Sequence, residues 1–185
     1  IRPSISFESN NLNNKKRNRN SSIKVSFNSI TRKNNKDVDS MHFQTTNNKS
    51  YIYNGFLIKD FNIFNIDAYD KNGTSNNKTL IKFFPQLGIE TQYPLISYSK
   101  KSSFLIEPKV QVFISPEDYY NNKIRNEDSL ELDLNSSNLF NYDRYSGNDR
   151  KESGVRLNYG VLLKKTNSNK QSLSSSLGQT YNNNK

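Results

Sequence analysis

The sequence contains no cysteine and a single histidine, His42. Without cysteine the chain has no internal disulfide, no thiolate nucleophile and no cysteine-ligated zinc. His42 stands between Met41 and Phe43, which predicts a side chain on a strand face rather than a metal ligand. No stretch approaches the ~18 consecutive apolar residues that suggest a transmembrane helix, whereas a transmembrane β-strand needs only ~9–11 residues.

Apolar residues, glycine and proline are also scarce. Hydrophobic residues make up 32% of the 185 residues, with 7 Gly and 5 Pro, and the mean hydropathy is -0.92. Yet there are 11 Tyr and 11 Phe, too many aromatic residues for a disordered linker. This composition argues against a compact helical enzyme, a collagen-like chain and a disordered tail. The chain begins at Ile1 and ends in a polar run, so we expect residues 1–185 to be an internal fragment of a longer protein.

The formal net charge is +10, and most of the excess lies in the first 50 residues. The densest basic run, at 15–19, is interspersed with asparagine, a loop composition without helical periodicity. The run has no interleaved aromatic residues and no recognition-helix pattern. We therefore expect a solvated or lipid-phosphate-facing loop and no nucleic-acid partner.

Alternation of apolar and polar residues is the main structural signal, and it predicts half-buried β-strands. It is clear at 23–27, 87–93, 109–114, 130–135 and 155–164, and weaker at 5–7, 41–43, 51–58, 61–69 and 80–84. Residues 153–181 are predicted to form a hairpin, and 71–77 and 99–102 have loop compositions. The chain is therefore predicted to be all-β and antiparallel, with about ten strands. A soluble sandwich or barrel and a transmembrane β-barrel both fit this alternation.

The second half of the chain contains an ordered series of short motifs. They are Phe84 to Glu90, Tyr93 to Leu95, Ile106 to Val112 with Ser115-Pro116, Asn126 to Ser129, Asn138 to Phe140, Arg144 to Arg150, Glu152 to Gly154, Asn158 to Gly160, and Leu177 to Gln179. In order and spacing, over roughly residues 79–181, they resemble the LptD family, also called OstA or Imp. Residues 1–78 fit as earlier strands without a motif of their own.

The resemblance implies part of a large antiparallel transmembrane β-barrel in the bacterial outer membrane that transports lipopolysaccharide and inserts it into the outer leaflet. Its partners would be lipopolysaccharide, outer-membrane lipids, an LptE-like lipoprotein plug in the lumen and a periplasmic LptA-like bridge. The chain would lie in the middle of the barrel, away from the lateral gate. It implies no enzymatic activity and no cofactor. The alternatives are another outer-membrane porin or channel and a soluble all-β binding module.

The motif positions are our candidates for structural, lumen or loop roles. Pro85, Pro94 and Pro108 are expected to mark strand starts, bends or bulges, because proline removes a ladder donor. The full candidate set is Pro85, Pro94, Glu107, Pro108, Asn126, Asp128, Ser129, Leu139, Phe140, Arg144, Gly147, Asp149, Arg150, Gly154, Tyr159, Gly160 and Gly178. No catalytic or metal-binding residue is predicted.

The segment from Asp143 to Arg150 combines two aspartates and two arginines with Gly147, a composition suited to a tight loop with charge-assisted pairs. Two interpretations remain open: the loop folds into or caps the lumen, or it is an extracellular loop that only positions its flanking strands. In either case replacing Arg150 with alanine is expected to loosen it. The carboxylate pairs at 127–128 and 131–133 have no other residues that assemble a glycosidase pocket.

Overall fold

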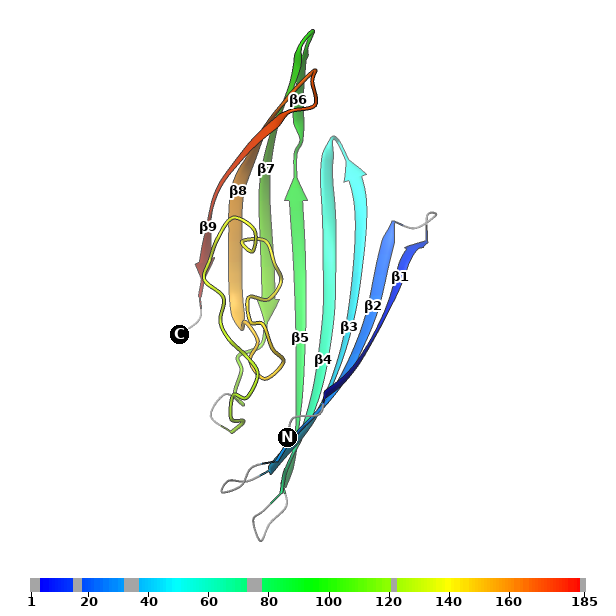
Figure 1. Ribbon diagram of the computed structural model, residues 1–185, viewed down its shortest axis with the longest axis vertical. Coiled ribbons are helices and arrows are strands. Elements are labelled where there is room, and N and C mark those ends of the chain that lie inside the picture. The colour runs from blue at the N-terminus through cyan, green and yellow to red at the C-terminus, as the bar shows by residue number, and fades with distance from the viewer. Residues whose placement is uncertain (1–3, 15–17, 32–36, 73–77, 121–122, 184–185) are drawn as a thin grey trace.

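The computed structural model describes residues 4–14, 18–31, 37–72, 78–120 and 123–183, and it contains one antiparallel β-sheet (Figure 1). The all-β prediction is confirmed. The strands are β1 Ser4–Asn14, β2 Arg19–Ile30, β3 Asp37–Tyr53, β4 Phe56–Asn72, β5 Lys78–Gln92, β6 Leu95–Ser99, β7 Ser102–Ser115, β8 Gly154–Asn167 and β9 Ser172–Asn182. None of these residues belongs to a helix long and apolar enough to cross a membrane.

The strands follow one another across the sheet in the order β1-β2-β3-β4-β5-β7-β8-β9, and β6 pairs with β7. Within the described ranges β1 and β9 pair with no second neighbour, so the sheet is open and not a closed barrel. Figure 1 shows it curved and strongly twisted, with the long segment between β7 and β8 lying over one face. The predicted hairpin at 153–181 is confirmed as β8 and β9, which pair from Arg156 with Asn182 to Thr166 with Ser172.

Two of the three prolines mark one interruption of the ladder. Pro94 lies between β5 and β6, and Pro108 lies opposite this break, where β7 changes its neighbour. On one side Lys109 pairs with Gln92 of β5, and on the other Ile106 pairs with Leu95 of β6. Pro85 is inside β5 opposite Phe64, beyond the last pairing with β7 at Leu87, so its missing N–H disrupts no β5–β7 pair.

Two of the strand predictions are wrong. The segment 51–58 is not one strand, because Asn54 and Gly55 form a tight turn with positive φ (47° and 82°) between β3 and β4. The Asn-Gly pair is the typical signal for such a hairpin. The segment 130–135 is not a strand either: Glu131 forms an isolated bridge with Tyr145 of the same loop, flanked by backbone hydrogen bonds from Leu132 to Arg144 and from Ser146 to Leu130. Of the predicted basic loop at 15–19, residues 15–17 lie outside the described residues and Arg19 already begins β2. Of the predicted loop at 71–77, residues 73–77 lie outside them and Asn72 still belongs to β4.

The two faces of the sheet differ sharply in polarity. One, the polar face, carries buried hydrophilic side chains: His42, Asn65, Asp67, Lys82, Gln86, Glu90, Gln111, Arg156 and Asn158. The other, the apolar face, carries exposed hydrophobic side chains, among them Ile23, Phe27, Ile81, Phe83, Leu87, Ile89, Val110, Ile114, Val155 and Leu177. A small core lies on the polar face, where Ile63, Tyr69, Phe84 and Phe113 are buried together with Ile124 and Leu139 of the β7–β8 segment. A water-soluble sandwich would have the opposite arrangement.

Replacing Gly55 with alanine is expected to destabilise the protein by about 1–2 kcal/mol, because an L-residue is strained at φ 82° and its Cβ would lie 2.9 Å from the Tyr93 ring. The urea midpoint of unfolding measures this loss. The matched control is Asn54→Gly, which accepts a positive φ and should change stability by less than about 0.5 kcal/mol. Equal midpoints for the two variants would contradict the turn.

Candidate functional site

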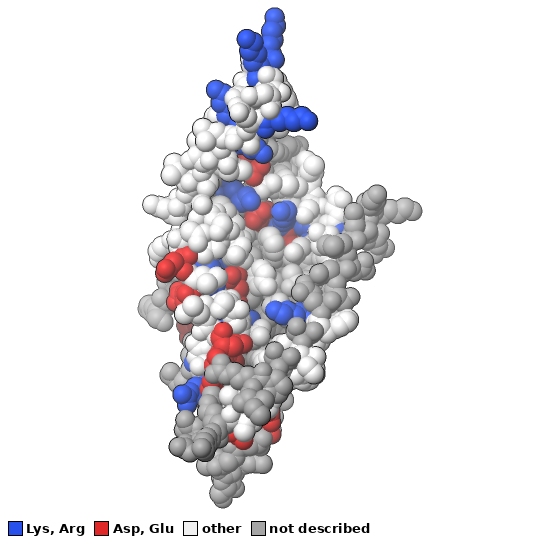
Figure 2. All heavy atoms as spheres, in the orientation of Figure 1, with Lys and Arg blue, Asp and Glu red and all other residues white. Residues whose placement is uncertain are grey.

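The described residues between the end of β7 and the start of β8, 116–120 and 123–153, are here called the covering loop. They lie over the polar face in front of β7 and β8 (Figure 1). Figure 2 shows acidic and basic side chains intermixed over this part of the molecule. The described candidate residues from Asn126 to Arg150 all belong to this loop, so the chain brings most of the predicted motif positions to one place.

The covering loop is held to the sheet by buried polar contacts. The Lys82 ammonium on β5 donates to Asp118 at 2.6 Å and to the Asp149 carbonyl at 3.3 Å, and the side chains of Lys82 and Asp118 are almost completely buried. The Tyr69 hydroxyl on β4 donates to Asp149 Oδ1 at 3.0 Å. Two adjacent strands therefore bind the same stretch of the loop.

Asp128 and Asp149 accept hydrogen bonds from one another's backbone. Asp149 Oδ2 accepts the N–H groups of Glu127 (2.7 Å) and Asp128 (3.2 Å), and Asp128 accepts those of Asn148 and Asp149, each at 3.0 Å. Hydrogen bonds from several N–H groups replace the water contacts that a carboxylate loses on burial. The two motifs that contain these aspartates, far apart in the sequence, therefore form one reciprocal unit, here called the aspartate clasp.

Neighbouring motif residues complete the clasp. Ser129 Oγ donates to Asp128 and accepts the N–H of Arg150, and the Asn126 side chain bonds to both the N–H and the carbonyl of Ser129. Gly147 is required by close approach: a Cβ there would lie 2.4 Å from the Asp128 carbonyl oxygen. Asn126, Asp128, Ser129, Gly147, Asp149 and Arg150 were predicted as motif residues, and the structure brings them together.

The surroundings shift the acidity of the two aspartates in opposite directions. Burial raises the pKa of Asp149 above its ordinary value, and the charge of Asp128 acts in the same direction. Burial alone would also raise the pKa of Asp128, but the N–H groups of Asp149 and Asn148 and the Ser129 hydroxyl outweigh it, so this pKa is lowered. Asp128 is therefore the carboxylate that the clasp keeps ionised.

A second charged group joins the end of the covering loop to β8. The Arg144 guanidinium donates to Glu152 through Nε at 3.0 Å, and Arg156 of β8 forms an ion pair with the same carboxylate. Arg156 also donates to the Asn141 carbonyl at 2.6 Å and lies over the Phe113 ring. Lys151 forms an ion pair with Asp143. Burial raises the pKa of Asp143, although the positive charge of Lys151 acts in the opposite direction.

Leu139 and Phe140 fit against two glycines of the β8–β9 pair. Gly160 and Gly178 are direct partners in that ladder, and a Cβ on Gly178 would lie 2.3 Å from Leu139. A Cβ on Gly160 would lie 3.4 Å from the Phe140 ring. The Phe140 carbonyl accepts a hydrogen bond from Gln111 at 2.9 Å, and Lys109 lies over its ring. The missing side chain of Gly178 thus creates the space for Leu139, whereas the close contact that Gly160 avoids is with the Leu177 carbonyl oxygen of the ladder, 2.6 Å from such a Cβ.

Beside this contact is a hollow of about 390 Å³, whose lining includes Glu107, Lys109, Phe140, Leu162 and Ser176. Glu107 therefore belongs to the same region. Tyr159 does not: it is exposed on the other face, where its hydroxyl bonds to Gln179. Gly154, with φ of 86°, only starts β8.

Sequence reasoning missed the polar partners supplied by the strands. His42 was expected on a strand face and lies there, but it is buried and its Nδ1 is 2.9 Å from Asp67. Asn158 donates to Gln111, and Gln111 donates to Glu90, in a buried row across three strands. In the sequence, these residues are marked only by their position on the polar side of alternating strands. Exposed residues occupy the same kind of position, so the burial of these side chains could not be predicted.

Replacing Arg150 with alanine is expected to loosen the covering loop, because its guanidinium donates to the Ile124 carbonyl at 2.8 Å and so joins the two halves of the loop. Loss of this charge-assisted bond costs about 1.5–3 kcal/mol, which corresponds to at least a tenfold faster proteinase K cleavage within the loop of the folded protein. Arg125→Ala is the control, since Arg125 is 66% exposed. Indistinguishable cleavage rates for the two variants would refute this role.

The family model described as "LptD: LPS transport system D" matches residues 3–185. No curated protein matches the chain with significance. The family match includes the first third of the sequence, where no motif was recognised, as well as the strands and the covering loop that hold the clasp. The chain therefore belongs to the LptD family of lipopolysaccharide transport proteins.

Proposed function

We propose that this chain is part of an outer-membrane β-barrel that transports lipopolysaccharide and inserts it into the outer leaflet. The observation that supports this most is the polarity of the sheet: hydrophilic side chains are buried beneath the covering loop, and large hydrophobic ones are exposed. A barrel in a bilayer needs an apolar exterior and a polar lumen. Membership of the LptD family supplies the transported molecule.

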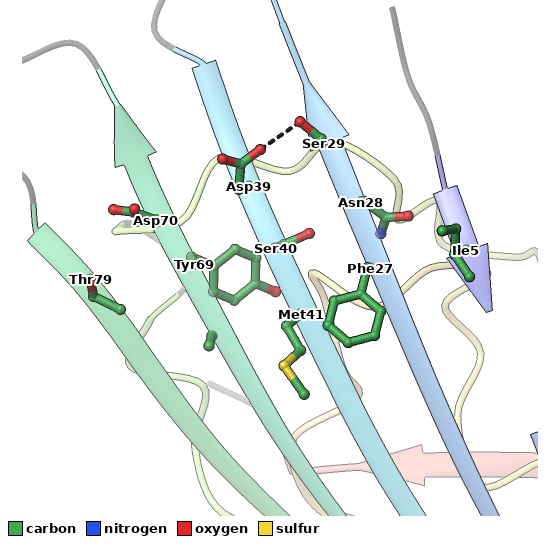
Figure 3. Close-up of a pocket in the computed structure, with 11 residues that line it drawn as sticks. Ile5, Phe27, Asn28, Ser29, Asp39, Ser40, Met41, Tyr69, Asp70 and Thr79 are labelled. Atoms are coloured by element: carbon green, nitrogen blue, oxygen red, sulfur yellow. Dashed lines mark hydrogen bonds between the residues drawn. The ribbon is translucent and has the colours of Figure 1, made fainter. Parts of the chain in front are cut away.

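The apolar face has dimensions suited to a bilayer. On β8 its side chains run from Val155 to Leu163, which is about 26 Å of extended chain. On the first strands, the row of apolar side chains stops at the same height on neighbouring strands. Figure 3 shows this in a hollow of about 410 Å³, where Phe27 and Met41 are followed by Ser29 and Asp39, joined by a 2.6 Å hydrogen bond. In the proposed barrel this row marks the edge of the hydrocarbon region.

The connections at the two ends of the sheet differ in length. At one end are short turns, such as Asn54-Gly55 and the links at 100–101 and 168–171, and at the other is the long covering loop. Bacterial outer-membrane barrels have short periplasmic turns and longer extracellular loops. We therefore place the covering loop on the cell-surface side, from which it folds back over the lumen wall. This corresponds to the first of the two interpretations of the loop.

The two open edges fit a fragment of a larger barrel. β1 and β9 expose backbone groups to which further strands would pair, and such an edge is unfavourable inside a membrane. We therefore assign residues 1–185 to the interior of the barrel domain. An LptE-like plug, a periplasmic LptA-like bridge and outer-membrane lipids would be its partners, by family membership.

The lumen surface available to a saccharide is smaller than the polar face. Asn65, Gln86, Gln111 and Asn158 are at most 2% exposed, because the covering loop and neighbouring strands bond to them. The accessible part lies towards the short turns, around the 390 Å³ hollow. There Lys59 and Lys109 each lie 3.6 Å from Glu90, and Glu107 lines the same hollow, so the two positive and two negative charges balance. An anionic saccharide would pass along this side of the loop by weak polar contacts.

Val110→Lys tests the membrane location, because Val110 is on the apolar face and 42% exposed. In a bilayer this change should cost about 2–4 kcal/mol of folding free energy near the midplane. Ser176→Lys, which adds the same charge on the polar face, is the matched control. The measurement is the urea midpoint of the full-length protein in lipid vesicles. If Val110→Lys were as stable as the control, a soluble binding module would be the better assignment.

Transport itself is tested with a photo-crosslinking amino acid at Ser176, which lines the hollow. In cells we expect a covalent adduct with lipopolysaccharide that disappears when its supply to the barrel is stopped. The same probe at Leu130, which is 68% exposed on the covering loop and does not line the hollow, reports contacts with lipopolysaccharide already at the cell surface. An adduct at neither position, or one at Ser176 that is independent of supply, would favour a different channel.

A further inference from the structure

A cluster of possible metal ligands lies where β3 meets the aspartate clasp. His42, Asp128 and Asp149 each offer one ligand atom, and these three atoms all lie within 4.8 Å of one another. Ligands about 2.0–2.4 Å from one ion are separated by no more than twice that distance, so a single ion could contact all three. The imidazole comes from the sheet, and the two carboxylates come from two separate parts of the covering loop.

Asp67 supplies an independent observation. It is 2% exposed, its Oδ1 lies 2.9 Å from His42 Nδ1, and its Oδ2 has no hydrogen-bond partner among the described residues. A carboxylate that accepts the second ring N–H of a histidine is the usual partner of a metal-bound imidazole, since it fixes the tautomer and makes the other nitrogen more basic. The other nitrogen, Nε2, meets only the neutral Ser40 hydroxyl, at 3.0 Å.

The charge balance of this region also favours a cation. Asp67, Asp128 and Asp149 bring three carboxylates together around one imidazole. Lys82 donates to the backbone carbonyl of Asp149 and forms its ion pair with a fourth carboxylate, Asp118. Asp67 and Asp149 are buried, whereas Asp128 is exposed, and buried carboxylates are costly unless opposite charge compensates them. Asp149 Oδ1 accepts a bond from Tyr69 and keeps a second lone pair for a further partner.

We propose that His42, Asp128 and Asp149 bind a divalent transition-metal ion of the zinc or manganese class, with Asp67 orienting the imidazole. One nitrogen and two carboxylate ligands suit these ions better than calcium or magnesium, which prefer oxygen alone. His42 Nε2 would be the nitrogen ligand, and water would complete the coordination. This site is independent of lipopolysaccharide transport.

Such an ion would join three parts of the chain. His42 lies on β3, Asp128 in the first half of the covering loop and Asp149 in the second half. Apart from this cluster, the β3 side chains contact the loop through a long hydrogen bond from Tyr142 to Gln44, at 3.4 Å. The ion would therefore attach the covering loop to β3, which the other buried contacts of the loop do not reach.

The test uses the full-length protein in detergent, stripped of metal with a chelator and titrated with Zn²⁺ in competition with a chromophoric indicator. We compare wild type with His42→Gln, which keeps an amide donor for Asp67, with Asp67→Asn, and with the control Glu131→Gln, an exposed carboxylate of the same loop. Wild type and control should bind one Zn²⁺ more per chain than His42→Gln. Asp67→Asn should bind that ion about 10–100-fold more weakly.

Proteolysis gives a readout that does not depend on other zinc sites in the longer protein. Zn²⁺ should slow proteinase K cleavage of the covering loop in wild type and in Glu131→Gln but not in His42→Gln. Equal zinc stoichiometry and affinity in all four proteins would overturn the proposal. So would a zinc-dependent protection of the loop that persists in His42→Gln, since the ion would then bind elsewhere.

Discussion

Lys82 and Asp118 form an ion pair, at 2.6 Å, from which water is almost completely excluded. A buried lysine is tolerated only when its charge is compensated and its donors are bonded, and here every such partner comes from the covering loop. The same dependence extends to Arg156, which Glu152 and the Asn141 carbonyl compensate. The polar face of the sheet and the covering loop are therefore one structural unit, because each would leave buried charges unpaired without the other.

This dependence accounts for the position of the sequence motifs. The Asp128 and Asp149 carboxylates accept hydrogen bonds from each other's backbone, Gly147 allows the two segments to touch, and Gly178 opens space for Leu139. None of these residues needs to contact a transported molecule to fulfil such a role. The motifs by which the chain resembles its family thus hold the covering loop to the polar face of the sheet.

The strands could be predicted from the sequence because alternation at Val155 to Leu163 reports directly on a two-faced sheet. Alternation does not predict a strand correctly where no neighbouring strand pairs with the segment. Leu130, Leu132 and Leu134 alternate with polar residues as in a strand, yet they are exposed in the covering loop. The polar second half of β3, from Gln44 to Ser50, has no apolar alternation and is a strand because it pairs on both sides. The contacts of His42 and Lys82 could not be predicted, since they depend on residues from 25 to 67 positions away.

The bond between Tyr69 and Asp149 spans 80 residues of sequence. The covering loop takes partners from β3, β4, β5, β7, β8 and β9, so its binding site does not exist until these strands have paired. Closing contacts of such long separation is slow, and its entropic cost falls once the intervening hairpins have formed. The loop is therefore expected to dock last, and a nascent sheet would expose its buried lysines and carboxylates to water throughout its earlier assembly.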